Sequence, residues 1–336
     1  MYKLIRPLLF KLPPETSHAL TLHALRLAGA IPPVAWALAK AFEAPAKPVR
    51  AFGLDFKNPV GLAAGYDKDG VAVRGLAALG FGHVEIGTVT PLPQPGNPKP
   101  RLFRLAEDQA VINRLGFPGK GAEFVAAALR GSRSIVYGLN LGKNKNTPLE
   151  SAAEDYLTLM RRFTPLADYL TINISSPNTV GLRRLQGREM LESLLGAIAA
   201  ERDVIATGRG GRIPVLVKLA PDLSDEELDD AVGVILDTGM DGVIATNTTL
   251  SREGLRSTHR AESGGLSGKP LTGLSDMVLS KVVKRVDDRI PVVGVGGISS
   301  SDDAKRKLDL GATLIQVYTG MIYAGPGLVK EIVTKI

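Results

Sequence analysis

The sequence predicts an α/β fold, a (β/α)8 TIM barrel with a small N-terminal helical extension, and three observations carry this prediction. Short β-branched runs alternate with amphipathic helical stretches from about residue 49 onward, the order that produces a parallel sheet covered by helices. These runs number eight, and each ends in polar residues or glycine, as strands do at the functional end of such barrels. A length of 336 residues also suits one barrel domain. A doubly wound open sheet is the alternative arrangement of the same elements.

Composition narrows the classes of function. The chain has no cysteine, which excludes disulfides, thiolate nucleophiles and cysteine-bound iron–sulfur clusters and fits a reducing compartment. The net charge of +7 favours anionic partners such as a phosphorylated cofactor, an acidic metabolite or an anionic membrane surface. Nucleic acid is the least favoured partner, because basic residues form no block and aromatic residues make up only 5%. No metal site is expected either, because the four histidines show no ligand spacing.

Residues 1–44 differ in character from the rest, so we expect two units, a helical segment over 1–44 and a barrel over 45–336. A first helix begins at Pro14 and ends before Pro32, and His18 is expected to line this segment. A second, nearly apolar helix spans 34–42 and contains Trp36, the only tryptophan. Either a cap packed on the barrel or an interfacial membrane anchor fits this pattern. The apolar stretch before Lys11 is too short for a secretory signal, and no stretch reaches the roughly 20 residues that span a bilayer.

The eight predicted strands span residues 59–64, 83–89, 135–141, 169–174, 214–219, 242–246, 291–295 and 314–318. Between the fifth and sixth strands, Ser224 and Glu227 form a capping-box pattern that opens a helix over 225–236. Two insertions interrupt the alternation. Residues 91–118 contain a predicted hairpin over 101–105 and 110–114, and residues 248–275 are expected to form a long Gly/Ser loop. Loops of this length are usually lids or binding loops.

The fourth strand ends in the most informative segment, Asn173-Ile174-Ser175-Ser176-Pro177-Asn178. Proline stops the strand because it lacks an N–H group. Asparagine offers donors and an acceptor, which suits a flat polar heterocycle better than a phosphate or a metal. A turn that merely closes the strand is the alternative. Because all strand ends meet at one face of a barrel, their asparagines and lysines are expected to form a single site.

Two lysines and a glycine run add to this prediction. Lys218 interrupts an apolar strand, where its charge is costly unless it meets an anion or polar group; a side chain that reaches solvent is the alternative. Lys68 follows a Gly-Tyr-Asp turn. The start of a helix is the alternative, although a helix N-terminus is a poor place for a cation without an anionic neighbour. The run Gly294–Gly297 departs from the dinucleotide fingerprint. On a barrel it predicts a phosphate loop completed by residues 318–320, and therefore a monophosphate cofactor.

These motifs resemble those of the dihydroorotate dehydrogenases over nearly the whole chain. The matching segments are residues 61–68, 85–91, 113–117, 173–178, 245–249 and 294–297. The family is an FMN-binding (β/α)8 barrel that oxidises (S)-dihydroorotate to orotate in pyrimidine synthesis. Ser176 stands where its cytosolic class has Cys, and residues 1–44 match the helical extension of the membrane-associated class 2. The resemblance is therefore to class 2, which uses a serine base and passes electrons to quinone. Tyr66 departs from the small or aliphatic residue usual in the family.

The resemblance implies roles for individual residues. Ser176 would be the catalytic base, with Thr179 and an ordered water relaying its proton, and Lys218 would stabilise negative charge on the reduced flavin. The implied substrate residues are Lys68, Asn113, Arg114, Leu115, Gly116, Phe117, Asn173, Asn178, Asn247 and Thr248. The implied FMN residues are Ala64, Gly65, Lys68, Thr88, Asn140, Asn173, Lys218, Thr246, Gly268, Gly297, Tyr318 and Thr319.

The resemblance also implies partners and a location. Dihydroorotate and orotate, a membrane quinone and the membrane surface would be the partners, and nucleic acid would not. We expect a monomer bound peripherally to the cytoplasmic face of the inner membrane. Two other functions stay open from the residues. One is a flavin-dependent reductase of the dihydropyrimidine or dihydrouridine type, against which a lysine for the substrate carboxylate argues; the other is a non-enzymatic membrane-surface protein on a barrel scaffold.

Overall fold

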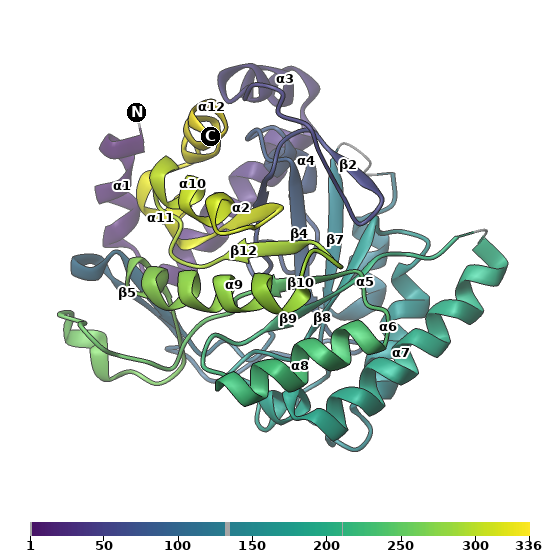
Figure 1. Ribbon diagram of the computed structural model, residues 1–336. Helices are drawn as coiled ribbons and strands as arrows, with labels where there is room; N and C mark the ends of the chain where they lie inside the picture. Colours follow the sequence, from purple (N-terminus) through teal and green to yellow (C-terminus); the bar gives the residue numbers. More distant parts are fainter. Residues whose placement is uncertain (1, 132–134, 210) are drawn as a thin grey trace.

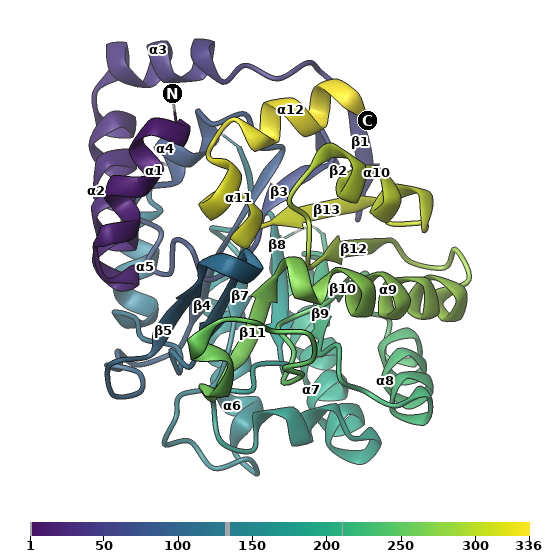
Figure 2. The same ribbon diagram turned by 90° about the vertical axis from the view of Figure 1, so that its left-hand side faces the viewer.

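A computed structural model describes residues 2–131, 135–209 and 211–336. Its centre is a closed barrel of eight parallel strands in chain order, which confirms the (β/α)8 prediction and excludes the open sheet (Figures 1 and 2). Every strand lies within two residues of its predicted run. The strands are β3 (Val60–Leu62), β4 (His83–Val89), β7 (Val136–Leu141), β8 (Tyr169–Asn173), β9 (Val215–Leu219), β10 (Gly242–Ala245), β12 (Val292–Val295) and β13 (Leu314–Val317).

Helices surround the barrel and cover its outer face (Figure 2). They are α4 (Val73–Ala77), α5 (Gly121–Ala128), α6 (Ala152–Phe163), α7 (Arg188–Arg209), α8 (Asp225–Asp237), α9 (Thr272–Val286), α10 (Ser301–Asp309), α11 (Thr319–Ala324) and α12 (Leu328–Lys335). The predicted capping box opens α8: the Ser224 hydroxyl accepts from the Glu227 N–H at 3.2 Å, and the Glu227 carboxylate accepts from the Ser224 N–H at 2.8 Å. Both bonds pair donors that have no partner inside the helix.

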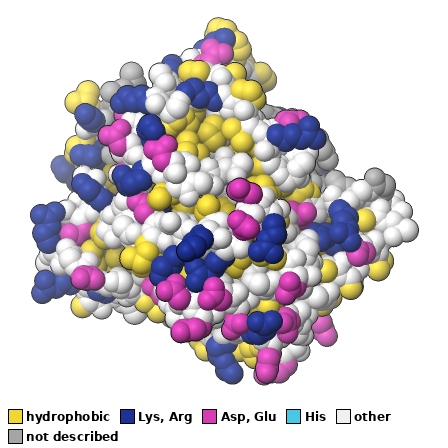
Figure 3. Space-filling model, in the orientation of Figure 1, with side chains coloured by type: hydrophobic (Ala, Val, Ile, Leu, Met, Phe, Trp, Pro, Cys, Tyr) yellow, Lys and Arg dark blue, Asp and Glu magenta, His cyan; other side chains and the backbone are white. Residues whose placement is uncertain are grey.

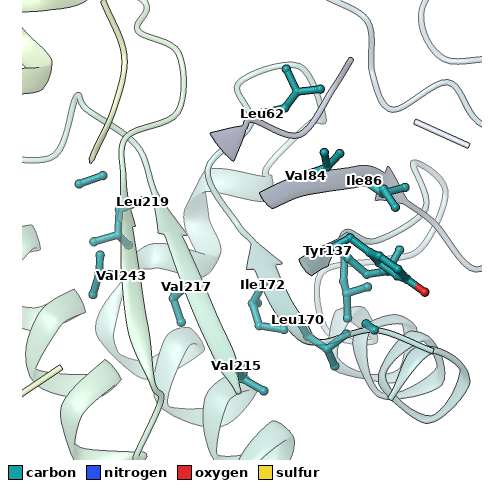
Figure 4. Packing of buried hydrophobic residues seen from close by; sticks show 14 of the residues in the cluster. Leu62, Val84, Ile86, Tyr137, Leu170, Ile172, Val215, Val217, Leu219 and Val243 are labelled. Atoms are coloured by element: carbon teal, nitrogen blue, oxygen red, sulfur yellow. The ribbon is translucent and has the colours of Figure 1, made fainter. Parts of the chain in front are cut away.

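Alternation along each strand divides the buried residues into two sets. On β9, Val215, Val217 and Leu219 pack outward against the helices, whereas Leu216 belongs to a separate cluster inside the barrel. Figure 4 shows part of the outer set, including Val217. Because side chains alternate between the two faces of a strand, Lys218 shares the inner face with Leu216. This period of two decides which residues can reach a site inside the barrel.

A hairpin that the sequence analysis missed closes the N-terminal end of the barrel. It consists of β1 (Val49–Ala51) and β2 (Leu54–Phe56), strands of three residues that are too short for a periodic signal. Phe56 from this hairpin packs against His83, with ring centroids 5.3 Å apart. Gly138 leaves room for Tyr169 in the same layer, because a Cβ there would lie 2.1 Å from the tyrosine ring. With this end filled by side chains, the opposite end is the open one.

A small antiparallel sheet covers part of the C-terminal end. The predicted hairpin is confirmed as β5 (Leu102–Leu105) and β6 (Ala110–Asn113). The prediction of a continuous loop over 248–275 was wrong, because β11 (Gly265–Gly268) adds to the free edge of β6 and α9 begins at Thr272. Leu266 of β11 is buried with residues of both hairpin strands. The described residues also form four short 3-10 helices: η1 (Ala106–Asp108), η2 (Leu182–Gln186), η3 (Thr258–Ala261) and η4 (Lys269–Leu271).

Three helices form the N-terminal segment: α1 (Tyr2–Lys11), α2 (Pro14–Ala30) and α3 (Pro32–Ala41). Helix α1 was not predicted from the sequence, and α3 begins two residues before its predicted start. At the start of α2, Glu15 pairs with Arg101 beside the hairpin at 2.9 Å. Leu4, Leu8 and Trp36 are at least 64% exposed, so this segment presents apolar side chains to its surroundings.

No single helix of the described residues is long and apolar enough to cross a membrane. Helices α2 and α3 would pass that test only as a pair, and they are bent by 111° at their junction. Figure 3 shows one face of the molecule, on which Lys and Arg side chains are interspersed with Asp and Glu. On this face the basic side chains are therefore not gathered in one separate patch.

Candidate functional site

A cavity of about 1100 Å³, including its opening, lies at the C-terminal ends of the barrel strands. Most of the predicted site residues line it together: Ala64, Gly65, Lys68, Thr88, Asn113, Leu115, Gly116, Phe117, Asn173, Ser176, Asn178, Lys218, Thr246, Asn247, Thr248, Gly268, Gly297, Tyr318 and Thr319. Two predicted residues, Arg114 and Asn140, are not part of the lining. The β5–β6–β11 sheet adds Leu102, Val111 and Ser267, which the sequence analysis did not select.

The asparagines of the cavity are oriented by one another. The amide of Asn173 donates to the Thr88 hydroxyl at 2.9 Å and to the Asn140 carbonyl at 3.0 Å. Asn140 therefore lies one layer behind the lining and holds groups that face the cavity. The amide of Asn178 donates to the Asn113 carbonyl at 3.0 Å, which joins the β8 end to the hairpin insertion. These bonds leave a preformed set of amide groups around the cavity.

The two neighbouring serines have different surroundings. Ser176 lines the cavity, and its hydroxyl accepts one bond, from the Asn178 N–H at 3.3 Å. Ser175 is fully buried behind it; its hydroxyl donates to Asn173 at 3.1 Å and accepts from the Asn247 amide at 2.9 Å. Ser176 is therefore the serine whose hydroxyl can reach a bound molecule. Three residues further on, the buried Thr179 hydroxyl has no hydrogen-bond partner among the described residues.

Lys218 lies inside the barrel mouth and is 4% exposed. Its ammonium is 3.9 Å from a carboxylate oxygen of Glu85, which is itself fully buried. Burial lowers the pKa of Lys218, and the nearby Glu85 charge opposes that shift. The ammonium faces the cavity with no hydrogen-bond acceptor among the described residues, and a buried cation of this kind is stabilised by an anion or a polar ligand.

Glu85 is the principal buried charge that the sequence analysis missed. Its carboxylate accepts from Asn140 at 2.8 Å, Gln316 at 2.9 Å and Thr171 at 3.2 Å. All of these partners are donors, so the carboxylate oxygens of Glu85 are hydrogen-bonded despite their burial. The sequence did contain a signal. Glu85 is the one acidic residue of β4, a strand that is buried along its whole length, and it lies two residues from Gly87 on the inward face.

Lys68 and Arg114 have different relations to the cavity. The Lys68 ammonium donates to the Gly65 carbonyl at 2.6 Å. Burial lowers the pKa of Lys68 to about 8, against the opposing charges of Asp69 and Asp67. Arg114 turns its side chain away: its guanidinium pairs with Glu262 at 2.6 Å and lies over the Phe103 ring at 4.5 Å. Only the backbone of Arg114 is left to act beside the cavity.

One end of the cavity is built from close-packed glycines. Gly297 has a positive φ of +73°, and a Cβ there would lie 2.3 Å from the Thr272 hydroxyl. Gly268 also has a positive φ, of +99°, and its Cβ would lie 2.4 Å from the Gln109 carbonyl. Beside them the Ser267 and Thr319 hydroxyls are 2.8 Å apart. Bare backbone and hydroxyl groups make this end suitable for a phosphate group.

A second cavity of about 1420 Å³, including its opening, lies between the N-terminal helices and the barrel. It shares six lining residues with the first cavity: Lys68, Leu102, Val111, Leu115, Pro118 and Tyr318. Most of its other walls are apolar and come from α1 and α2, including Ile5, Leu9, Phe10 and Leu25. The two cavities are therefore neighbours, and these shared residues form the wall between them.

Several polar side chains also line this second cavity, among them Glu15, Ser17, His18, Thr21 and Arg104. The His18 ring nitrogen Nε2 lies 2.7 Å from the Tyr66 carbonyl, as expected for a residue that lines the cap. Burial and the Lys68 charge lower the pKa of His18 to about 4, so this ring is neutral near neutral pH. The Tyr66 and Thr21 hydroxyls are 3.2 Å apart. No group of metal-ligating side chains occurs among the described residues.

Comparisons with known proteins agree with this geometry. Residues 48–336 match the family model for dihydroorotate dehydrogenase. A dihydroorotate dehydrogenase (quinone) of Idiomarina loihiensis is 50% identical over 338 residues, covering 100% of both chains. Another, of Azotobacter vinelandii, is 49% identical and covers 100% of this chain and 96% of its own.

Solved structures agree as well. DHODH from Eimeria tenella in complex with ferulenol superposes with a TM-score of 0.85 at 40% identity, covering 96% of this chain and 90% of its own. The ligand-free structure from the same organism gives a TM-score of 0.82 at 42% identity, covering 92% of this chain and 93% of its own. The likeness therefore extends over at least 92% of the chain.

Proposed function

The chain belongs to the dihydroorotate dehydrogenase family, and we propose that it oxidises (S)-dihydroorotate to orotate in pyrimidine biosynthesis and passes the electrons to a quinone. One observation carries the proposal: Ser176, Lys68 and Lys218 line one cavity, and that cavity adjoins a second, apolar one. A hydroxyl, two cations and several amides suit a planar anionic substrate, and the apolar cavity suits a lipid-like acceptor.

FMN is the cofactor that fits the first cavity. Lys218 supplies a buried cation without a hydrogen-bond acceptor among the described residues, and Gly268 and Gly297 supply a phosphate cradle that a side chain would fill. When bound, FMN accepts hydride from the substrate and hands the electrons on. Thr88, Thr246 and Lys218 would contact its ring system, and Tyr318 and Thr319 its phosphate end. Lys218 would stabilise negative charge on the reduced ring.

The substrate would occupy the part of the cavity nearest Ser176. Asn113, Asn173, Asn178 and Asn247 offer amide donors and acceptors to the heterocycle, and Lys68 offers a positive charge to its carboxylate. Residues 114–117 would border the substrate through backbone atoms and the Phe117 ring. Because these groups are already hydrogen-bonded to one another, little reorganisation is needed when the substrate binds.

Ser176 is the proposed base. Its hydroxyl oxygen would take the proton from C5 of the substrate while hydride leaves C6. A serine hydroxyl holds its own proton tightly, so that proton needs an exit. The buried Thr179 hydroxyl, three residues away and without a partner among the described residues, supports a relay through Thr179 and a water. No histidine within the described ranges lines this cavity, which favours the relay over a serine–histidine pair.

The second cavity is the proposed quinone site. Its walls come from α1, α2 and the barrel mouth, and Tyr318 and Val111 belong to both cavities. A quinone ring placed there would lie one wall away from the flavin. Residues 1–44 would then form a functional unit that serves the acceptor, and residues 45–336 the unit that oxidises the substrate.

The proposal extends to the location of the protein. Quinones are membrane lipids. Exposed Leu4 and Leu8 lie on α1, which lines the quinone cavity, and exposed Trp36 lies on α3, the next helix after α2. Peripheral binding to the inner membrane follows, on the cytoplasmic face, because a chain of net charge +7 is attracted to an anionic leaflet. We take the protein to be a monomer, since residues of one chain line both cavities.

A flavin assay tests the proposed function. Purified full-length protein should be yellow, and (S)-dihydroorotate should bleach its flavin absorbance, whereas dihydrouracil, which lacks the carboxylate, should not. A long-tailed quinone should then restore the colour. Bleaching by dihydrouracil at a comparable rate would favour a dihydropyrimidine-type reductase, and protein without flavin would favour a non-enzymatic role.

A further inference from the structure

Arg183 lies in η2 and lines neither cavity, yet it bonds to the loops that follow three barrel strands, and two of these loops line the first cavity. Its Nε donates to the Ser175 carbonyl at 3.0 Å, after β8. Its Nη1 donates to Asp222 at 2.7 Å, after β9, and its Nη2 donates to the Thr248 carbonyl at 2.8 Å, after β10. One guanidinium thus connects the ends of three neighbouring barrel strands.

Asp222 completes this connection from the other side. Besides Arg183, it accepts from the Thr249 hydroxyl and from the Leu250 N–H, the latter at 3.3 Å. The side chains of Arg183 and Asp222 are 21% and 25% exposed, so the pair is partly shielded from solvent. A guanidinium holds its donors in a fixed plane, which an ammonium does not. The pair therefore sets the spacing between the loops as well as attracting them.

Two of the three contacts, those to Ser175 and Thr248, fall next to proposed substrate groups. The Ser175 carbonyl belongs to the peptide bond that leads into Ser176, and Thr248 follows Asn247 directly. The Asn247 amide donates to the Ser175 hydroxyl at 2.9 Å, so the same two loops also touch on the side of the cavity. A shift of either loop would change the distance between the proposed base and the amide that would hold the substrate.

We propose that Arg183, held by Asp222, is a positioning residue for proton removal: it sets Ser176 in register with Asn247 and Thr248. This inference rests on the proposed function. Neither Arg183 nor Asp222 lines either of the two cavities, so we expect flavin binding and reoxidation by quinone to change less than proton removal when they are replaced. A misplacement of about 1 Å in a reacting group can cost about 100-fold in rate, which sets the size of the effect.

The test uses full-length, flavin-loaded protein in stopped-flow experiments with (S)-dihydroorotate. We expect Arg183→Gln, Arg183→Lys and Asp222→Asn to lower the limiting rate of flavin bleaching by about 10- to 100-fold. The reoxidation rate with quinone should stay at the wild-type value. Arg188→Gln is the matched control, because Arg188 pairs with Asp230 at 2.9 Å between the adjacent helices α7 and α8, away from the cavity loops.

A double variant separates positioning from general loosening of the fold. If Arg183 acts through Ser176, adding Arg183→Gln to Ser176→Ala should slow bleaching no further than Ser176→Ala alone. If the bleaching rate of the double variant were instead reduced by the product of the two single-variant factors, the proposal would be overturned. So would a limiting rate within about twofold of wild type in Arg183→Gln, where about 10- to 100-fold is expected.

If Arg183→Gln fails to fold or loses flavin, Arg183→Lys and Asp222→Asn decide the question, and wild-type limiting rates in those two variants would overturn the proposal. Failure of the proposed function is distinguishable, because wild-type protein would then not be bleached by dihydroorotate at all.

Discussion

Removing one hydroxyl at a time from Ser175 and Ser176 separates chemistry from stability. The two residues are adjacent and chemically identical, but only Ser176 lines the cavity. We expect Ser176→Ala to keep its flavin and to lose most of its bleaching rate with dihydroorotate. We expect Ser175→Ala to keep most of that rate and to unfold more easily.

The structure sets the size of both effects. A positioned general base contributes about 10²- to 10⁴-fold in rate, which corresponds to about 2.7–5.4 kcal/mol of activation free energy. The Ser176 hydroxyl accepts a single bond at 3.3 Å, so its loss should cost only about 0.5–1.5 kcal/mol of folding free energy. The Ser175 hydroxyl pairs with both Asn173 and Asn247 in a buried position. Its removal leaves those amides short of a partner and should cost about 1–3 kcal/mol.

Stopped-flow bleaching measures the rates, and urea unfolding followed by flavin fluorescence measures the stabilities. The limiting rate of Ser175→Ala should fall by less than about tenfold, below the range for a lost base. Ser176→Cys should retain activity with its pH–rate profile moved to lower pH, because a thiol ionises more readily than a hydroxyl. Equal rate losses at the two positions, or a Ser176→Ala variant as fast as wild type, would refute the assignment of the base.

Three further predictions test the charge, the acceptor cavity and the barrel core. The ratio kcat/KM for dihydroorotate should fall as pH rises above about 8, because Lys68 has a pKa of about 8 and loses its charge while the substrate carboxylate stays negative. In initial-rate measurements, Lys68→Arg should keep kcat/KM constant up to a higher pH, because a guanidinium stays charged. Ala24→Trp narrows the second cavity and should raise the KM for a long-tailed quinone about tenfold, which corresponds to about 1.4 kcal/mol. Its rate of flavin bleaching by dihydroorotate should stay at the wild-type value. The exposed control Ala37→Trp should have the wild-type KM for quinone. Gly138→Ala places a Cβ 2.1 Å from the Tyr169 ring and should cost about 1–3 kcal/mol in denaturant unfolding. Gly233→Ala, in open space on helix α8, should stabilise by about 0.5–1 kcal/mol, and the reverse order of these two variants would contradict the packing.

The barrel was predictable because its signals are local. Each strand is a short β-branched run, and the Ser224–Glu227 capping box lies within four residues, so sequence neighbours alone determine these elements. The end of β8 was predictable for the same reason, because the proline that stops the strand stands among the asparagines and serines that carry its polar groups. Once eight parallel strands are known, closure brings their ends together. This is why so many predicted residues line one cavity.

Contacts between distant segments decided the remaining features. Nothing near Leu266 in the sequence shows that the edge of β6 is free to pair with it, so this segment looked like loop. Arg114 turns away because Glu262, which is 148 residues further along the chain, offers it a carboxylate. Glu85 reaches Lys218 only when the barrel closes, and the second cavity exists only where α1 and α2 pack against the barrel mouth. The sequence by itself determined the strands and the polar residues at their ends, since short-range periodicity and turn chemistry encode both. The tertiary structure decided which side chains face one another, because ion pairs, edge pairing and cavities form between segments that only folding brings together.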